Sequence, residues 1–157
     1  MFRKLPAMGA TFIICSFLAA EQPAPAVFTA EQAAAGRTAY MSTCGKCHTE
    51  TLGGRSGKAG EMPPVEAIPG YMQETVKTYF GVVPPLRGEK FLSKWETTQA
   101  LAKRVKEAIG GFPPENTTET THLDIAAYVL QVSGARAGSE ALTADTVVEL
   151  RKLNLNK

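Results

Sequence analysis

Two cysteines and a histidine lie within five consecutive residues of this 157-residue chain, in the run Cys44-Gly45-Lys46-Cys47-His48. Residues i and i+3 of a helical turn lie on one face. Both thiols can therefore add to the two vinyl groups of one porphyrin, and the next residue, His48, can reach the iron as its proximal ligand. Cys-x-x-Cys-His is the signature of covalent haem c attachment.

Other interpretations of these three residues have less support in the sequence. A structural zinc site takes four ligands. Beyond this run, and apart from Cys15 in the apolar N-terminal segment, the chain has only His122 and carboxylates to offer. A thioredoxin-type pair needs a βαβ context, which this sequence does not indicate. A disulfide between Cys44 and Cys47 is the ordinary fate of a lone pair in an oxidising compartment. We therefore interpret the run as a haem c site, with one covalent haem.

The first 26 residues read as an export signal. Arg3 and Lys4 form a basic start, an uncharged apolar run follows from Leu5 to Ala20, and Ala24-Pro25-Ala26 fits the small-x-small pattern of a cleavage site. This pattern predicts a signal peptide at 1–26, cleaved between 20 and 26, and a periplasmic protein without stable membrane insertion after cleavage. The alternative is a retained membrane anchor. Cys15 lies inside the apolar run, so cleavage leaves only the two cysteines of the motif.

The length and the net charge of the chain limit its domain number and the kind of partner it binds. A chain of 157 residues suits one ordinary domain. The formal net charge of +2 gives no indication of a nucleic-acid partner. We expect an all-α protein with a main domain at 27–134, an extended loop or insert at 56–82, and an extension with a short helix at 135–157.

Helix signals surround the motif. Thr29 followed by Gln32 is a capping box, which predicts the start of a helix. Within that helix Gly36 and Tyr40 share one face, and the glycine predicts close approach by another helix. Four more helices are expected. One spans 71–80, with Met72, Val76, Tyr79 and Phe80 on one stripe. The next is capped by Thr97 or Thr98, has the apolar seam Leu101, Val105 and Ile109, and ends at Gly110-Gly111. A third spans 122–131, with Ile125 and Tyr128 on one side, and a short last helix begins at Thr143.

With these elements in place, the chain resembles the class I c-type cytochromes over about residues 27–157. Gly36 and Tyr40 before the cysteines, and Ile125 and Tyr128 in the last main helix, match pairs that pack across each other in that family. The resemblance implies a cytochrome c fold, with helices wrapped around one covalently bound haem.

A second stretch carries the resemblance. The run from Pro84 to Gly88, which contains Leu86, matches the family's Pro-x-Leu-x-Gly turn. In the family the proline carbonyl accepts the other N–H of the proximal histidine, which implies that role for Pro84. A nearby tryptophan often binds a haem propionate in relatives, and Trp95 is the candidate here. The alternative for Trp95 is a plain core aromatic.

The stretch "PPLRGEKFLSKW" and the C-terminal tail are most similar to mono-haem cytochromes found beside dehydrogenases that depend on pyrroloquinoline quinone (PQQ). The resemblance implies a non-enzymatic electron carrier. Its implied partners are a periplasmic dehydrogenase upstream, and a terminal oxidase or another cytochrome downstream.

One position departs from the family. Phe112, before Pro113, stands where the family has the methionine that is the second axial ligand. The distal side is then open beneath an apolar cover, or another group binds there. We consider Met62 the first candidate, ahead of Met72, whose helical stripe predicts core packing, and of His122 or a lysine.

The departure leaves two further functions open beside electron transfer. With an open distal site the protein would be a haem module that binds a small ligand, as a sensor or weak peroxidase. Alternatively, it is a subunit of a larger complex, with residues 56–82 and the C-terminal tail as the interface.

Overall fold

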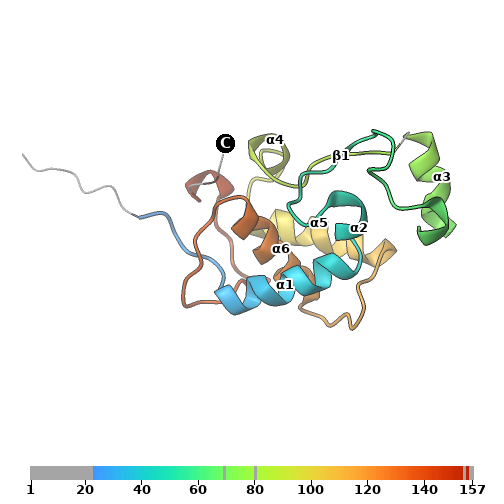
Figure 1. Ribbon diagram of the computed structural model, residues 1–157. Coiled ribbons are helices and arrows are strands. Elements are labelled where there is room, and N and C mark those ends of the chain that lie inside the picture. The colour runs from blue at the N-terminus through green and yellow to red at the C-terminus, as the bar shows by residue number, and fades with distance from the viewer. Residues whose placement is uncertain (1–22, 69, 80, 154, 156–157) are drawn as a thin grey trace, which may run out of the picture.

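The computed structural model describes residues 23–68, 70–79, 81–153 and 155 (Figure 1). Nearly all of the expected signal peptide, including Cys15, lies outside this part of the chain, as does Phe80. The described residues are mostly helical, in agreement with the all-α class. The elements are α1 (Ala30–Ser42), α2 (Gly45–His48), β1 (Arg55–Ser56), η1 (Val65–Ala67), α3 (Gly70–Thr78), β2 (Val82–Val83), α4 (Glu89–Leu92), α5 (Thr98–Gly111), α6 (Thr121–Val132) and η2 (Leu150–Lys152).

Helix α1 begins where the sequence predicts, and one half of its predicted capping box is wrong. The Thr29 hydroxyl accepts the backbone N–H of Gln32 at 3.1 Å. The Gln32 side chain does not return to Thr29. It donates to the Leu142 carbonyl at 2.9 Å and accepts the Leu142 N–H at 2.7 Å. The Leu142 backbone offers both a donor and an acceptor, so it replaces the expected bond between the Gln32 side chain and the Thr29 backbone. These two hydrogen bonds join the C-terminal segment to α1.

The crossing of α1 and α6 forms the centre of the molecule (Figure 1). Gly36 is buried there, and a Cβ atom added to it would lie 1.8 Å from the Asp124 carbonyl oxygen. The close approach predicted for this glycine is therefore confirmed. One turn further along α1, the ring of Tyr40 packs against that of Tyr128 with centroids 5.3 Å apart.

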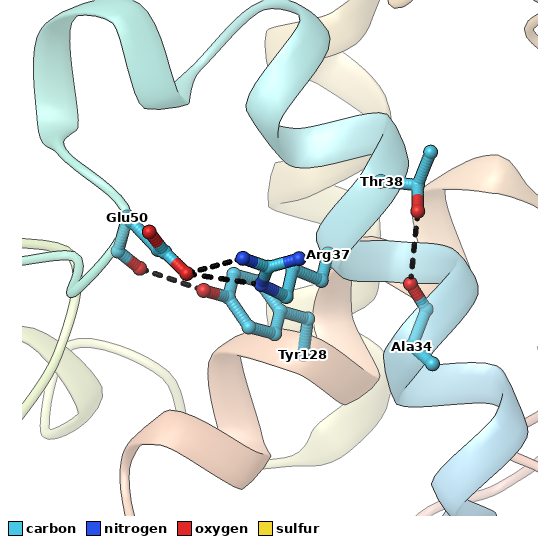
Figure 2. A network of polar contacts seen from close by, with 5 residues as sticks. All are labelled: Ala34, Arg37, Thr38, Glu50 and Tyr128. Carbon is cyan, nitrogen blue, oxygen red and sulfur yellow. Dashed lines mark hydrogen bonds and ion pairs between the residues drawn. The ribbon is translucent and has the colours of Figure 1, made fainter.

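Both tyrosines of the crossing also hold the chain that follows the cysteine motif. The Tyr40 hydroxyl donates to the Thr49 carbonyl at 2.9 Å, and the Tyr128 hydroxyl donates to the Glu50 carbonyl at 2.6 Å. Figure 2 shows Tyr128 beneath Glu50, whose carboxylate pairs with Arg37 of α1. The crossing therefore fixes the position of residues 49 and 50, directly after His48.

Helix α5 follows its predicted seam with one exception. Thr97 caps it by accepting the Ala100 N–H at 3.1 Å, and it ends at Gly111. Leu101 and Ile109 are buried, whereas Val105, between them on the same stripe, packs against the core and stays partly exposed. The seam therefore has a position that the described protein atoms do not cover.

The α-helix expected from Thr143 is wrong, because the short 3-10 helix η2 is the one helix among the described residues of this tail. The β-branched run around Val148 is not helical and is bound by α5. Buried Thr98 donates its N–H to the Val148 carbonyl at 2.9 Å, and its hydroxyl donates to the Thr146 carbonyl at 2.6 Å. Leu142, Leu150 and Leu153 join the same apolar core as α1, α5 and α6.

The 56–82 segment contains more structure than a loop. It begins in β1, which pairs antiparallel with β2 with Arg55 opposite Val83. Between the strands lie η1 and α3, and Figure 1 shows α3 at the edge of the molecule beyond α2. No described residue of α3 is buried, so the core packing predicted for Met72 is wrong. Within the described residues, no helix combines the length and apolar character needed to cross a membrane.

Candidate functional site

Helix α2 is a single turn that brings the motif together. The backbone N–H groups of Cys47 and His48 both donate to the Cys44 carbonyl, at 3.2 and 2.8 Å. Both cysteines are free thiols and partly buried. Burial raises the pKa of the Cys44 thiol to about 11 and also raises the pKa of Cys47. Both side chains are therefore thiols near neutral pH, which slows thiol–disulfide exchange.

Arg55, in β1, fixes the end of this turn. Its guanidinium donates to the Cys47 and Lys46 carbonyl oxygens, each at 2.9 Å, and to the Glu61 carbonyl. The last carbonyls of a helix have no partner within the helix and carry the negative end of its dipole. Arg55 satisfies two of them. The sequence reasoning missed this residue, because its only local signal is a basic side chain in a glycine-rich run.

The imidazole of His48 is oriented by Pro84. Its Nδ1 atom lies 2.9 Å from the Pro84 carbonyl oxygen, which can only accept, so Nδ1 carries the proton. The contact expected from the Pro84 turn is thus present. Burial lowers the pKa of His48, which favours the neutral ring. The Nε2 atom keeps its lone pair, the state in which histidine binds a metal.

Gly54 makes room for this contact. Its N–H donates to the His48 carbonyl at 3.1 Å, and its φ is +72°. A Cβ atom there would lie 2.2 Å from the Val83 carbonyl oxygen and 2.8 Å from the Pro84 carbonyl carbon. Only glycine fits this backbone. A glycine-rich run is typical of a flexible loop, so the Gly53-Gly54 pair soon after the motif is the one sequence signal of this contact.

Several apolar side chains outside the motif are only partly covered. Leu86, Phe91, Trp95 and Val105 pack against the core and remain partly exposed. Leu86 is held by its N–H, which donates to the Leu52 carbonyl at 2.9 Å. The indole N–H of Trp95 is buried and has no hydrogen-bond partner among the described residues.

These features fit a haem. A buried donor without a partner costs about 1–3 kcal/mol, and a propionate would satisfy it. A flat apolar macrocycle would cover the partly exposed side chains, and the neutral His48 ring offers Nε2 to iron. Cys44, Cys47, His48, Leu86 and Trp95 are thus the residues that would hold the group.

Phe112 belongs to an aromatic pair. It follows the last residue of α5 as the C-cap, and its carbonyl accepts the Thr43 hydroxyl at 3.3 Å. Its ring stacks on that of Tyr71 from α3, with centroids 5.2 Å apart and planes inclined by 25°. The Phe112 ring has no lone pair to donate to a metal ion. The 56–82 segment therefore reaches Phe112 through Tyr71.

The other candidate iron ligands lie in different places. Met62 is next to the β1–β2 strands, where its Cγ atom would lie 3.1 Å from a Cβ atom at Gly81. His122 is in the first turn of α6, and burial and the charge of Lys106 lower its pKa. Met72 lies in α3 and lines a hollow beside Cys47.

That hollow lies between the motif and the 56–82 segment. Lys46 and Cys47 form one wall, and Ile68, Tyr71 and Met72 form much of the other. Its volume is about 50 Å³, which is room for a few atoms and far less than a porphyrin needs. A haem at Cys44 and Cys47 would therefore lie beside the hollow, or would widen it by moving α3.

Among the described residues, no group of three or more histidine, cysteine, aspartate and glutamate side chains is placed to bind one metal ion. Comparisons of the chain with protein families, curated proteins and solved structures found no match.

Proposed function

We propose that this protein is an exported mono-haem c-type cytochrome of class I that carries electrons between other proteins. The observation that carries the proposal is the His48–Pro84 contact beside two free thiols. An oriented, neutral imidazole one residue after a Cys-x-x-Cys turn is what covalent haem attachment requires. A redox disulfide would not require it, and a structural zinc site would need four ligands, whereas the described residues place no group of three or more histidine, cysteine, aspartate and glutamate side chains together.

Each residue then has a defined part. The thiols of Cys44 and Cys47 each add across one vinyl group, so an S–C and a C–H bond form, the S–H bond breaks, and no oxidant is consumed. His48 binds the iron through Nε2, with Pro84 holding its Nδ1 proton. Trp95 donates to a propionate, and Leu86 covers part of the ring. The haem supplies a one-electron couple between ferrous and ferric iron.

The partners follow from the family resemblance. We place the protein in the periplasm, after removal of residues 1–26, between a PQQ-dependent dehydrogenase and a terminal oxidase or another cytochrome. The whole chain is nearly neutral, with a formal net charge of +2. Docking to these partners should therefore depend only modestly on ionic strength.

A second function has one observation in its favour. By the family resemblance, Phe112 stands where the axial methionine is expected, and its ring has no lone pair for iron. If no other residue takes that place, the iron has an open site, and the protein is a haem module that binds a small ligand such as carbon monoxide or nitric oxide.

Absorption and electron paramagnetic resonance spectra of the oxidised protein test both functions. An electron carrier with two protein ligands gives low-spin iron that is inert to carbon monoxide when reduced. High-spin iron that binds carbon monoxide readily would favour the ligand-binding module. A purified mature protein without covalent haem would contradict both.

A further inference from the structure

Arg55 places a positive charge directly on the backbone of the cysteine motif. Its Nε atom donates to the Cys47 carbonyl and its Nη2 atom donates to the Lys46 carbonyl, each at 2.9 Å, and its Nη1 atom donates to the Glu61 carbonyl. An arginine side chain stays protonated at any pH at which proteins are folded, and a carbonyl oxygen can only accept. The guanidinium is therefore fixed at three points and keeps its full charge.

The charge of Arg55 is not neutralised by a carboxylate. Among the described residues, none of the ion pairs involves Arg55. The Glu61 carboxylate instead accepts hydrogen bonds from the Ser56 hydroxyl and from the backbone N–H groups of Ser56 and Lys58. Arg55 is also only partly exposed, so solvent and salt screen its charge less than that of a surface side chain. Three carbonyl dipoles, two of them at the negative end of α2, offset the cost of holding it there.

The neighbours of this charge are the residues that would bond the haem. Cys47, which accepts from Nε, would carry one thioether bond, and His48 would bind the iron. Gly54, the residue before Arg55, donates its N–H to the His48 carbonyl at 3.1 Å. Gly54 and Arg55 together satisfy the last three carbonyls of α2, so moving the charge away from the motif would cost these hydrogen bonds.

We infer that Arg55 raises the reduction potential of the proposed haem, because its permanent charge beside Cys47 and His48 disfavours ferric iron. The inference rests on the proposed haem attachment. Ferric iron carries one more positive charge than ferrous iron, and like charges repel more strongly where water is partly excluded. This effect does not depend on which group occupies the distal side of the iron.

The test compares the midpoint potential of the mature holoprotein with that of three variants. Arg55→Gln removes the charge and keeps a hydrogen-bond donor, and Arg55→Lys keeps the charge. Arg136→Gln makes the same change in net charge on an exposed residue of the C-terminal extension. In Arg55→Gln we expect the ferrous-to-ferric ratio at a fixed electrode potential to fall about threefold or more, where a tenfold change corresponds to about 59 mV. Arg55→Lys and Arg136→Gln should stay close to the original protein.

A second variant without the charge, Arg55→Met, repeats the measurement if Arg55→Gln does not fold, and it should lower the potential as well. The inference is overturned if the variants without the charge keep the original potential, or if Arg55→Lys or Arg136→Gln lowers it as much as they do. Urea unfolding of the same variants measures the structural role of the Arg55 hydrogen bonds, since a residue with that role alone would change stability and leave the potential unchanged.

The covalent haem is measured separately. The mass and the pyridine haemochrome spectrum report it in each protein, so a potential that does not respond to Arg55 leaves haem attachment intact. Absence of the haem from the original protein would instead contradict the proposed function.

Discussion

The Nδ1 atom of His48 lies 2.9 Å from the carbonyl oxygen of Pro84, although 36 residues separate them in the chain. Gly54 controls this relationship, since it bonds the His48 carbonyl and its Cα faces the Val83–Pro84 backbone without room for a side chain. A carbonyl that accepts the other ring N–H of a metal-binding histidine fixes the tautomer and the ring orientation of that histidine. The position of the Pro84 carbonyl is therefore a property that mutation can test.

Gly54→Ala should displace Pro84 from His48. The new methyl group meets backbone atoms at 2.2 and 2.8 Å, so we expect overpacking of about 1–3 kcal/mol, in addition to about 1–2 kcal/mol for a positive φ. Gly60→Ala is the matched control, because Gly60 has φ +81° and nothing within 4 Å of an added Cβ atom. Urea unfolding measures the loss of stability, and the ¹⁵N NMR signal of the His48 Nδ1–H reports whether the contact with Pro84 is kept. Equal losses of stability and of this signal in Gly54→Ala and Gly60→Ala would refute the role of Gly54.

Gly36→Ala should destabilise the crossing of α1 and α6. An added Cβ atom lies 1.8 Å from the Asp124 carbonyl oxygen, so the helices must separate, at a cost of about 3 kcal/mol or more. Gly110→Ala on α5 meets nothing within 4 Å and should instead stabilise by about 1 kcal/mol, since alanine is the better helix former. Thermal unfolding of the two variants gives the comparison, and a stable Gly36→Ala would contradict the packing.

Stability should fall at alkaline pH because of Tyr40 and Tyr128. Burial is the largest cause that raises the pKa of each phenol, and each donates its proton to a backbone carbonyl. The folded state therefore holds these protons more tightly than the unfolded state. Their contribution is complete below the ordinary tyrosine pKa of about 10 and is lost as pH rises through the higher folded-state values.

The free energy of unfolding measured from pH 8 to 11 checks this. Tyr40→Phe should lower stability by about 1 kcal/mol at pH 8, through the lost hydrogen bond, and should make the alkaline decline shallower. An unchanged decline in Tyr40→Phe would show that this phenol does not cause it.

Trp95→Phe should change how the reduction potential depends on pH. If the buried indole N–H donates to a charged propionate, its loss raises the pKa of that propionate. Ionisation of the propionate favours ferric iron, so the fall in potential should move to higher pH in the variant. Protein-film voltammetry over the neutral range measures it. An unchanged profile would leave Trp95 as a core aromatic that packs on Phe91, 6.1 Å away.

Local patterns predicted the elements that carry the motif. The Thr29 cap, the Gly36–Tyr40 face and the Ile125–Tyr128 face can be read from spacing, because each depends on helical periodicity and on a residue type with one strong preference. The Pro84 contact came from a resemblance and from no pattern within the chain. It joins distant residues, and nothing in the local sequence indicates which carbonyl a histidine will meet.

The rest depended on tertiary partners. The Gln32 side chain bonds Leu142 and not its own helix, and the segment at Thr146 and Val148 bonds Thr98 in place of forming a helix. Arg55 and Gly54 contact backbone atoms, so their residue types alone do not indicate that they position the cysteine motif and the Pro84 carbonyl. The stripe of α3 has the helical period but faces no core, and periodicity alone does not show what a helix packs against.

The mass and visible spectrum of the mature protein, purified after expression with a haem c assembly system, test the central claim most directly. We predict a mass greater than that of the polypeptide by one haem, a pyridine haemochrome typical of two thioether bonds, and no thiol that can be titrated after unfolding. A colourless protein with the mass of the bare polypeptide and two free thiols would contradict the account.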